Sequence, residues 1–203
     1  MSPPILWSFR RCPYAMRARL AIHVAGIAID HREILLRDKP ALFVETSPKA
    51  TVPVMVDQGR VIEESLDVML WALDQNDPEG WLEMPGFGFD LIAENDGPFK
   101  TALDRYKYHT RHADADIEAE RQKAGLFLHK LNRMLEGRPY LFGDAPRLAD
   151  MAILPFLRQF ANTDRAWFDD QPWPDLRDWL DRFLASPRFA AIMAKHPLWS
   201  DRP

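Results

Sequence analysis

The chain contains one cysteine, and its neighbours favour a reactive thiol over an inert one. Cys12 follows a short apolar run and directly precedes Pro13. Proline is preferred at the first position of a helix, so we expect Cys12 at a helix N-terminus. There the backbone N–H groups and the positive end of the helix dipole stabilise a thiolate. The alternative is a buried thiol that behaves as a small hydrophobic side chain.

The charge near Cys12 indicates the same chemistry. Nearby cations lower the pKa of a thiol, and the stretch before Asp30 has no acidic residue but several basic ones: Arg10, Arg11, Arg17 and Arg19. Ala15 stands where a Cys-x-x-Cys protein has its second cysteine. A reactive Cys12 therefore needs a thiol from outside the chain to complete a redox cycle.

The composition restricts the class of protein. A chain of 203 residues holds one large or two small domains. A formal net charge of -4 gives no general attraction to nucleic acid or to an anionic membrane, so we expect neither as a partner. The sequence shows no signal-peptide pattern and no apolar stretch of membrane-spanning length. Together with a single cysteine, this predicts a reducing, cytoplasmic location.

The first 76 residues alternate between strand and helix patterns, and residues 77–88 have the composition of a linker. Apolar alternation and turn residues predict strands at 5–9, 27–35, 52–56 and 61–62, with helices at 13–25, 40–45 and 65–75. The order βαβ followed by ββα indicates a small α/β domain over residues 1–76. Residues 89–203 are predicted to form an all-α domain, with helices at 89–111, 116–136, 148–162, 175–185 and 189–195.

Three motifs follow the first strand at a characteristic spacing: Cys12-Pro13-Tyr14-Ala15, Val52-Pro53 and Glu64-Ser65. Together they resemble the glutathione transferase superfamily over essentially the whole chain, and most of all its cysteine-type branch, with Omega-like and glutaredoxin-like members. The resemblance implies a thioredoxin-like N-terminal domain and an all-α C-terminal helical bundle. It also implies glutathione as co-substrate and Cys12 as the catalytic residue.

The resemblance assigns three further residues, Val52, Pro53 and Lys39, to glutathione binding. Val52-Pro53 resembles the family's cis-proline turn, in which the Val52 backbone pairs with the peptide backbone of glutathione like an added strand. The alternative is a trans proline that merely begins a strand. Lys39 matches the lysine that reaches the glycyl carboxylate of glutathione in Omega-like relatives. Its alternative is a solvated surface lysine.

The Glu64-Ser65 motif opens the last helix of the first domain. A helix N-terminus offers free N–H groups to an anion, and the resemblance implies that Ser65 holds the γ-glutamyl carboxylate of glutathione. Ser65 is otherwise only an N-cap. Glu64 either engages the ammonium group of glutathione or favours the first helical turn. Tyr14 takes the place of the aromatic residue beside the cysteine, where it contributes backbone contacts and packing.

Candidate residues in the helical part carry weaker signals. Asn95, Phe99 and Tyr106 fall where the family builds its hydrophobic substrate pocket, but their spacing fits the core of one helix equally well. His109 and His112 have a spacing compatible with a metal pair, yet no third ligand is evident nearby, and we expect no metal.

The segment leading into the predicted helix at 148–162 resembles the family's N-capping box, with one departure. Relatives carry Ser or Thr three residues before Asp150, whereas this chain has Arg147. Only the aspartate half of the box remains, and a lost cap typically costs about 1 kcal/mol of stability.

The residues and the resemblance together predict a glutathione-dependent thiol transferase or reductase that acts through a Cys12–glutathione mixed disulfide. The second substrate is then a small disulfide or electrophile, as in deglutathionylation or dehydroascorbate-type reduction. Conjugation or dehalogenation of a small electrophile is an alternative. A non-enzymatic interaction protein, similar to the stringent starvation protein lineage, is another. The family is commonly dimeric, so we expect a homodimer.

Overall fold

The computed structural model describes residues 2–111 and 114–200. They divide into two compact units, one within Met1–Glu79 and Ser186–Pro203 and the other within Gly80–Ala185. The sequence predicted a single helical domain that includes all residues from 89 onward. The structure instead groups the C-terminal segment with the first unit, because this segment packs against α1 and pairs with the sheet.

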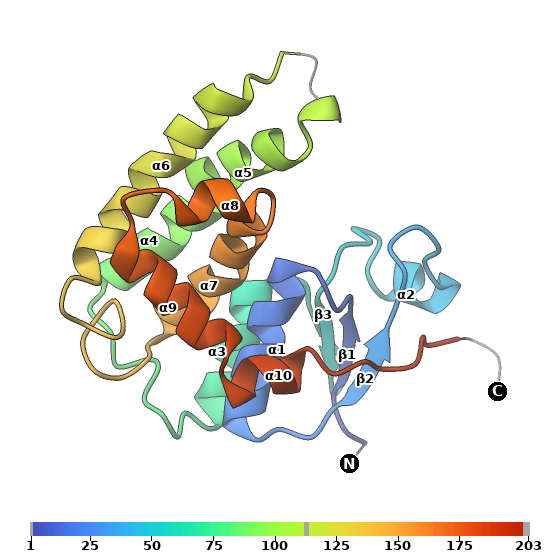
Figure 1. The fold of residues 1–203 in the computed structure, drawn as a ribbon. Helices are drawn as coiled ribbons and strands as arrows, with labels where there is room; N and C mark the ends of the chain where they lie inside the picture. The colour runs from blue at the N-terminus through green and yellow to red at the C-terminus, as the bar shows by residue number, and fades with distance from the viewer. Residues whose placement is uncertain (1, 112–113, 201–203) are drawn as a thin grey trace. The chain divides into compact units, whose positions relative to one another are not determined.

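A four-stranded mixed sheet forms the centre of the first unit, with the strand order β2-β1-β3-β4 (Figure 1). β1 runs parallel to β2 and antiparallel to β3, and β4 is antiparallel to β3. Trp7 lies opposite Arg32 on one side and Val54 on the other. The strands are β1 (Ile5–Ser8), β2 (Asp30–Glu33), β3 (Val54–Asp57) and β4 (Arg60–Ile62). This sheet confirms the predicted α/β fold.

Helices cover both faces of this sheet. α1 and α3 pack against each other, and α10 packs against α1, whereas α2 lies on the opposite face, where Phe43 contacts Trp7 at 5.4 Å between ring centroids. Pro13 begins α1, and Gly26 ends it with a positive φ of 69°, which glycine adopts without strain. These helices are α1 (Pro13–Ala25), α2 (Ala41–Thr46), α3 (Ser65–Gln75) and α10 (Pro187–Ile192).

The chain after α10 covers the edge strand β2. Leu198 forms a parallel bridge to Glu33, and the Trp199 N–H donates to the Glu33 carbonyl at 2.8 Å. The Trp199 ring lies 4.8 Å from that of Trp7, with the Arg32 guanidinium over both rings. An exposed edge strand is a site for unwanted pairing, and this segment occupies it.

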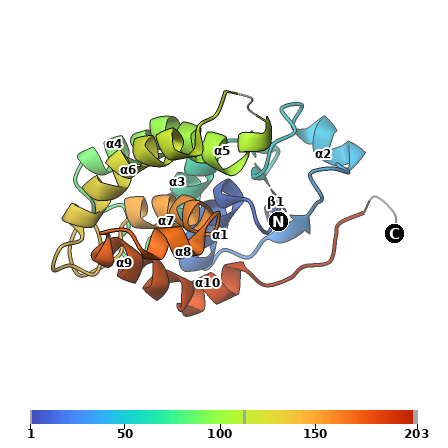
Figure 2. The ribbon, with the colours of Figure 1, turned by 45° about the horizontal axis from the view of Figure 1, so that its top comes forward.

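The second unit is a helical bundle, as predicted. α7 is its most buried helix and lies between the layer of α4, α5 and α6 and helix α9 (Figure 2). The helices are α4 (Phe87–Glu94), α5 (Lys100–Lys107), α6 (Ile117–Met134), α7 (Leu148–Ala161), α8 (Arg165–Asp169) and α9 (Pro174–Leu184). None of the helices in the described part of the chain has both the length and the apolar character needed to span a membrane.

The prediction of one helix over residues 89–111 was wrong in detail. A π-helical turn, Asn95–Phe99, separates α4 from α5, and a 3-10 turn, His109–Arg111, follows. Pro98 has no N–H to donate and its ring crowds the preceding turn, which the wider π turn accommodates. The sequence also missed α8, whose five residues are too few for periodicity. Its signal is Asp164, which caps the N–H of Trp167 at 3.1 Å.

The start of α7 keeps only half of a capping box, as the sequence indicated. The fully buried Asp150 carboxylate accepts from the N–H groups of Arg147 and Leu141, each at 2.9 Å. A guanidinium has no acceptor atom, so Arg147 cannot receive an N–H in return. Its side chain donates instead to the carbonyl of Gly80.

Candidate active site

A pocket of about 430 Å³ lies in the first unit, beside the N-termini of α1 and α3. This volume is within the range of small-molecule sites. The residues that the sequence assigned to catalysis or glutathione binding all line it, namely Cys12, Tyr14, Lys39, Val52, Pro53, Glu64 and Ser65. Motifs up to 53 residues apart in the sequence thus lie around one cavity, as a common binding site requires.

The sequence analysis missed the rest of the pocket wall, which is formed by Leu36, Lys49, Ala50, Thr51 and Glu63. Each of these residues lies within three positions of a predicted one. Their proximity in the chain was therefore the available signal.

Cys12 occupies the position that the sequence predicted. It is the N-cap residue of α1, with extended backbone angles (φ -73°, ψ 124°), and it forms no disulfide. Its side chain is half-buried, and its Sγ lies 3.8 Å from the carbonyl oxygen of Val52. No acidic residue lies in the first turn of α1. The thiol therefore faces the positive end of the helix dipole, and no acidic side chain of the first helical turn opposes it, which favours the thiolate.

The Val52-Pro53 peptide bond is cis, so the turn has the geometry that the resemblance implied. Val52 lies just before β3, and its side chain is almost wholly buried. Within the described residues, the Val52 N–H donates to no other group. Val52 lines the pocket, and its carbonyl oxygen is the atom that lies 3.8 Å from the Cys12 sulfur.

The structure corrects the alternative role of Ser65. Glu64 is the N-cap residue of α3, and Ser65 is the first residue of the helix. The Ser65 hydroxyl accepts from the buried Arg17 Nε at 2.9 Å, because a guanidinium can only donate. The Arg17 guanidinium also lies 5.3 Å from the centre of the Tyr14 ring. The hydroxyl proton of Ser65 is consequently available to an acceptor in the pocket.

Charges of both signs surround the mouth of the pocket. Lys49 forms an ion pair with Glu64, and the hydrogen bond between them raises the pKa of the Lys49 ammonium. Glu63 accepts from the buried hydroxyl of Ser47. Lys39 is exposed at the rim. Two lysines and two glutamates can thus contact the ends of a zwitterionic ligand.

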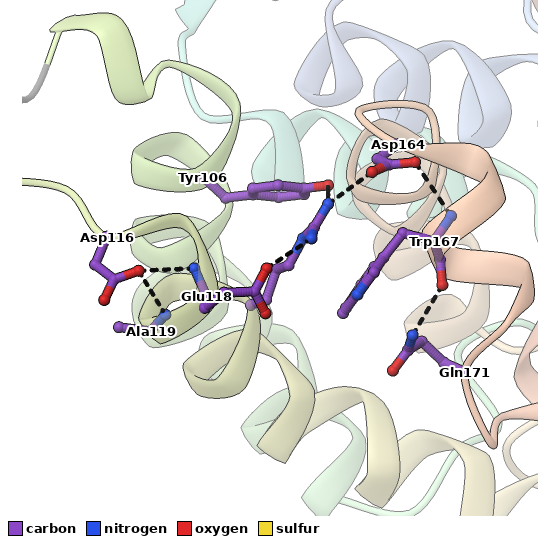
Figure 3. Close-up of polar contacts among 8 residues, drawn as sticks. Tyr106, Asp116, Glu118, Ala119, Asp164, Trp167 and Gln171 are labelled. Carbon is purple, nitrogen blue, oxygen red and sulfur yellow. Dashed lines mark hydrogen bonds and ion pairs between the residues drawn. The ribbon is translucent and has the colours of Figure 1, made fainter.

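The three expected substrate-pocket residues do not line the pocket around Cys12. Asn95, Phe99 and Tyr106 are only 0%, 2% and 3% exposed in the interior of the helical unit. The Tyr106 hydroxyl accepts from Arg121 at 3.1 Å, in the cluster that also contains Asp164 and Trp167 (Figure 3). Of the two interpretations that the spacing allowed, the core role is the observed one.

Of the two histidines considered as a metal pair, only His109 lies in the described part of the chain. His109 Nδ1 lies 3.2 Å from the carbonyl oxygen of Tyr106, whereas His112 lies outside the described residues. Over residues 2–111 and 114–200, no group of three or more His, Cys, Asp or Glu side chains is arranged to hold a metal ion.

Comparisons with protein families identify the superfamily. Residues 6–81 match the model of the glutathione S-transferase N-terminal domain, and residues 114–182 match that of the glutathione S-transferase C-terminal domain. Together the two matches cover well over half of the chain. The chain belongs to the glutathione transferase superfamily. The pocket described above lies in the part that matches the N-terminal domain of this superfamily.

Individual relatives are distant or partial. The chain is 44% identical to a "Probable glutathione transferase" of Aplysia californica over 57 residues, which is 28% of this chain and 62% of that protein, less than two thirds of its length. It is 25% identical to glutathione S-transferase omega-1 of Sus scrofa over 195 residues, covering 92% of this chain and 79% of the relative. The crystal structure of a glutathione transferase family member from Pseudomonas fluorescens has a TM-score of 0.81 at 16% identity, covering 95% and 92% of the two chains. This structural match shows the shared fold.

Proposed function

We propose that this member of the superfamily is a glutathione-dependent thiol transferase that acts through Cys12. The observation that carries the proposal is the placement of the half-buried Cys12 thiol at the N-terminus of α1, 3.8 Å from the carbonyl of Val52 in the pocket. The similarity to omega-1 of Sus scrofa supports the cysteine-type assignment. The Pseudomonas fluorescens structure contains two glutathione molecules, which supports glutathione as the co-substrate.

The pocket residues divide the binding of glutathione among them. The backbone of Val52 pairs with the peptide of glutathione, as in strand addition. The hydroxyl of Ser65 and the N-terminus of α3 receive the γ-glutamyl carboxylate. Lys39 reaches the glycyl carboxylate from the rim, and Tyr14 forms the wall beside the thiol. Glu64 is already paired with Lys49, so its carboxylate is held near the position of the ligand's ammonium group.

The chemistry is thiol–disulfide exchange in two steps. The Cys12 thiolate attacks the glutathionyl sulfur of a mixed disulfide between glutathione and a second thiol. A Cys12–glutathione disulfide forms, the original disulfide breaks, and the second thiol leaves as a thiolate that takes up a proton. A glutathione thiolate then attacks the glutathionyl sulfur bound to Cys12. Oxidised glutathione leaves and the Cys12 thiolate is regenerated, so glutathione supplies the reducing electrons.

Intact-mass measurement after incubation with oxidised glutathione tests the assignment. We expect the wild-type chain to gain one glutathionyl group, and we expect Cys12→Ser to gain none. In a coupled assay with a glutathione mixed disulfide, Cys12→Ser should fall to the uncatalysed rate. Ser65→Ala is the matched control, because it keeps the thiol while removing a ligand contact. It should raise the KM for glutathione and still accept the glutathionyl group.

Two outcomes would contradict the proposal. Full thiol-transferase activity of Cys12→Ser would show that Cys12 is not the catalytic residue. Conjugation of glutathione to an electrophile by Cys12→Ser, at the wild-type rate and without thiol transfer by either protein, would identify a conjugating enzyme instead.

A further inference from the structure

We infer that Glu33, on β2 and outside the pocket, is a positioning residue for Cys12. It holds the peptide of Arg10, two residues before the cysteine, and thereby fixes the loop that presents the thiol. The inference rests on the proposed role of Cys12, but its central measurement does not require that function.

The loop before Cys12 is held at one residue, Arg10, through the two peptide groups on either side of it. The Arg10 N–H donates to Glu33 Oε1 at 2.6 Å, and the Arg10 carbonyl accepts from Arg19 Nη2 at 2.7 Å. The loop then closes on itself through a hydrogen bond from the Cys12 N–H to the Phe9 carbonyl at 3.0 Å. β2 and α1 thus each hold one polar group of Arg10, and Cys12 lies only two residues after Arg10.

The two holding side chains are buried and charged. Glu33 is 7% exposed and Arg19 is 6% exposed. Burial alone would raise the pKa of Glu33, but hydrogen bonds from His31 and from the Arg10 N–H, together with the charge of Arg19, lower it overall. Glu33 is therefore a carboxylate at neutral pH, and a hydrogen bond to a carboxylate is stronger than one to a neutral acceptor.

Glu33 is itself fixed by the C-terminal segment. Its Oε2 lies 3.1 Å from His31 Nε2, and its backbone carbonyl accepts from the Trp199 N–H at 2.8 Å. The His31 ring stacks on that of His196, with 3.8 Å between ring centroids. The carboxylate therefore cannot follow the loop if the loop moves, which is the property a positioning residue needs.

The position of this loop matters for the reaction because Cys12 has two geometric requirements. Its sulfur must lie at the N-terminus of α1 to benefit from the dipole, and it must face the pocket beside Val52. A displacement of about 1 Å is enough to lower the rate of a positioned reaction up to about a hundredfold. Lys39, Val52 and Ser65 do not depend on the Arg10 peptide, so binding of glutathione should be largely preserved when Glu33 is changed.

Two substitutions of Glu33 distinguish the effect of its acceptor position from the effect of its negative charge. Glu33→Asp keeps the negative charge but shortens the side chain, so the acceptor no longer reaches the Arg10 N–H. Glu33→Gln removes the charge but keeps an oxygen at that distance. Asp30→Ala is the matched control, since Asp30 is an acidic residue of the same strand that pairs with Arg32 and has no contact with the loop.

The first measurement is the rate of Cys12 alkylation by iodoacetamide as a function of pH, which follows the thiolate. Positioning predicts that E33D is alkylated about fivefold more slowly at pH 7, with its pH midpoint shifted upward. E33Q should stay within about twofold of the wild type, as should D30A. Thermal unfolding of each variant, followed by circular dichroism, checks that the compared proteins are folded.

A purely electrostatic role for Glu33 gives the opposite pattern. Loss of the negative charge in E33Q would then favour the thiolate and lower its pH midpoint, while E33D would match the wild type. That result, or equal rates in all variants, would overturn the inference. If E33D does not fold, a midpoint in E33Q lowered by more than about half a pH unit counts against positioning, and an unchanged midpoint supports it.

The second measurement connects the residue to the proposed reaction. In thiol transfer, E33D should lower kcat about fivefold and leave the KM for glutathione within about twofold. An increase in KM without a decrease in kcat would contradict positioning. If the wild-type protein shows no thiol transfer at all, the proposed function fails, while the alkylation result still decides the role of Glu33.

Discussion

Arg19 in the first unit and Arg121 in the helical unit are both largely buried, but they have different partners. Arg121 donates to the carboxylates of Glu118 and Asp164 at 2.8 and 2.7 Å. Its guanidinium also lies 5.0 Å from the ring centre of Tyr106 and 4.2 Å from that of Trp167, two residues labelled in Figure 3. The positive charge of Arg121 is thus neutralised by carboxylates in direct contact with it.

Arg19 is surrounded mainly by neutral groups. It donates to the Ser8 hydroxyl and to the carbonyls of Phe9, Arg10 and Ile192. None of the described carboxylates touches it directly, although the charge of Glu33 acts on it. Burial lowers the pKa of Arg19 to about 10, so the side chain remains cationic at neutral pH.

The two arginines differ in how far direct contacts neutralise their charge. Burial would lower the pKa of Arg121, but its hydrogen bonds to Tyr106, Glu118 and Asp164 raise it overall. Two adjacent carboxylates cancel much of its field beyond the cluster, and it mainly joins α5, α6 and the start of α8. The field of Arg19 is not cancelled by direct contact, and it extends to Cys12.

The largest expected effect concerns Arg19→Met. The substitution leaves the Ser8 hydroxyl and the carbonyls of Arg10 and Ile192 buried without their donor, at roughly 1 kcal/mol or more each, so we expect the free energy of unfolding to fall by about 3 kcal/mol. Urea denaturation followed by circular dichroism measures this. Alkylation of Cys12 at pH 7 should also slow.

Arg19→Lys is the control for that substitution, because it keeps the charge but loses the planar set of donors. Its stability should be intermediate, and its thiol should remain more reactive than that of Arg19→Met. A loss below about 1 kcal/mol in Arg19→Met would show that the neutral partners of Arg19 hold it only weakly.

An effect of similar or smaller size involves Asp150 in the helical unit. Burial raises the pKa of Asp150 to about 6, despite its hydrogen bonds from Leu141 and Arg147. The folded state therefore binds a proton more tightly than the unfolded state, whose pKa is near 3.9. This contribution to stability is fully present below about pH 4 and is lost as the pH rises through about 6, by about 2–3 kcal/mol.

Glu33 in the first unit should act with the opposite sign. Its pKa is lowered in the folded state, so its contribution is present above the ordinary glutamate pKa and is lost as the pH falls through the folded value. Unfolding free energies between pH 3 and 7 measure both effects. Asp150→Asn should remove the decrease between pH 4 and 6, and an unchanged pH profile in that variant would contradict the assignment.

The smallest expected effect concerns Arg121→Met. The carboxylate partners are partly exposed, and the ring contacts contribute about 0.5–1 kcal/mol, so we expect a loss of about 1–2 kcal/mol in the free energy of unfolding. Cys12 alkylation should remain unchanged, in contrast to Arg19→Met. A slower alkylation in Arg121→Met would contradict the different roles assigned to the two arginines.

The sequence predicted the elements whose signals are local. Pro13 and Gly26 mark both ends of α1, and the observed helix has the predicted bounds. The Val52-Pro53 motif predicted the cis turn, and the motifs together predicted part of the lining of the pocket. Each of these signals depends on only a few neighbouring residues, so it can be read from the sequence. The resemblance to the superfamily supplied the spacing between the motifs.

The rest depended on contacts between distant parts of the chain. Arg19 and Ile192 are 173 positions apart, and no local sequence pattern predicts the hydrogen bond between them. Periodicity could not decide whether Phe99 and Tyr106 faced a pocket or the core. Aromatic side chains line substrate pockets as well as helix cores, and the same helical spacing fits either role. The pairing of Trp199 with Glu33 was missed for a similar reason, since one residue pair has no period.

The division of the first unit into two stretches of the chain has a consequence for biosynthesis. The helical unit is topologically an insertion, because the polypeptide leaves the first unit at residue 79 and returns to it at residue 186. During translation, more than a hundred further residues must therefore be synthesised after the sheet before its C-terminal segment exists. This is the segment that covers β2 and accepts the hydrogen bond from Arg19 Nε. The part of the molecule that is synthesised first is thus among the last to be completed.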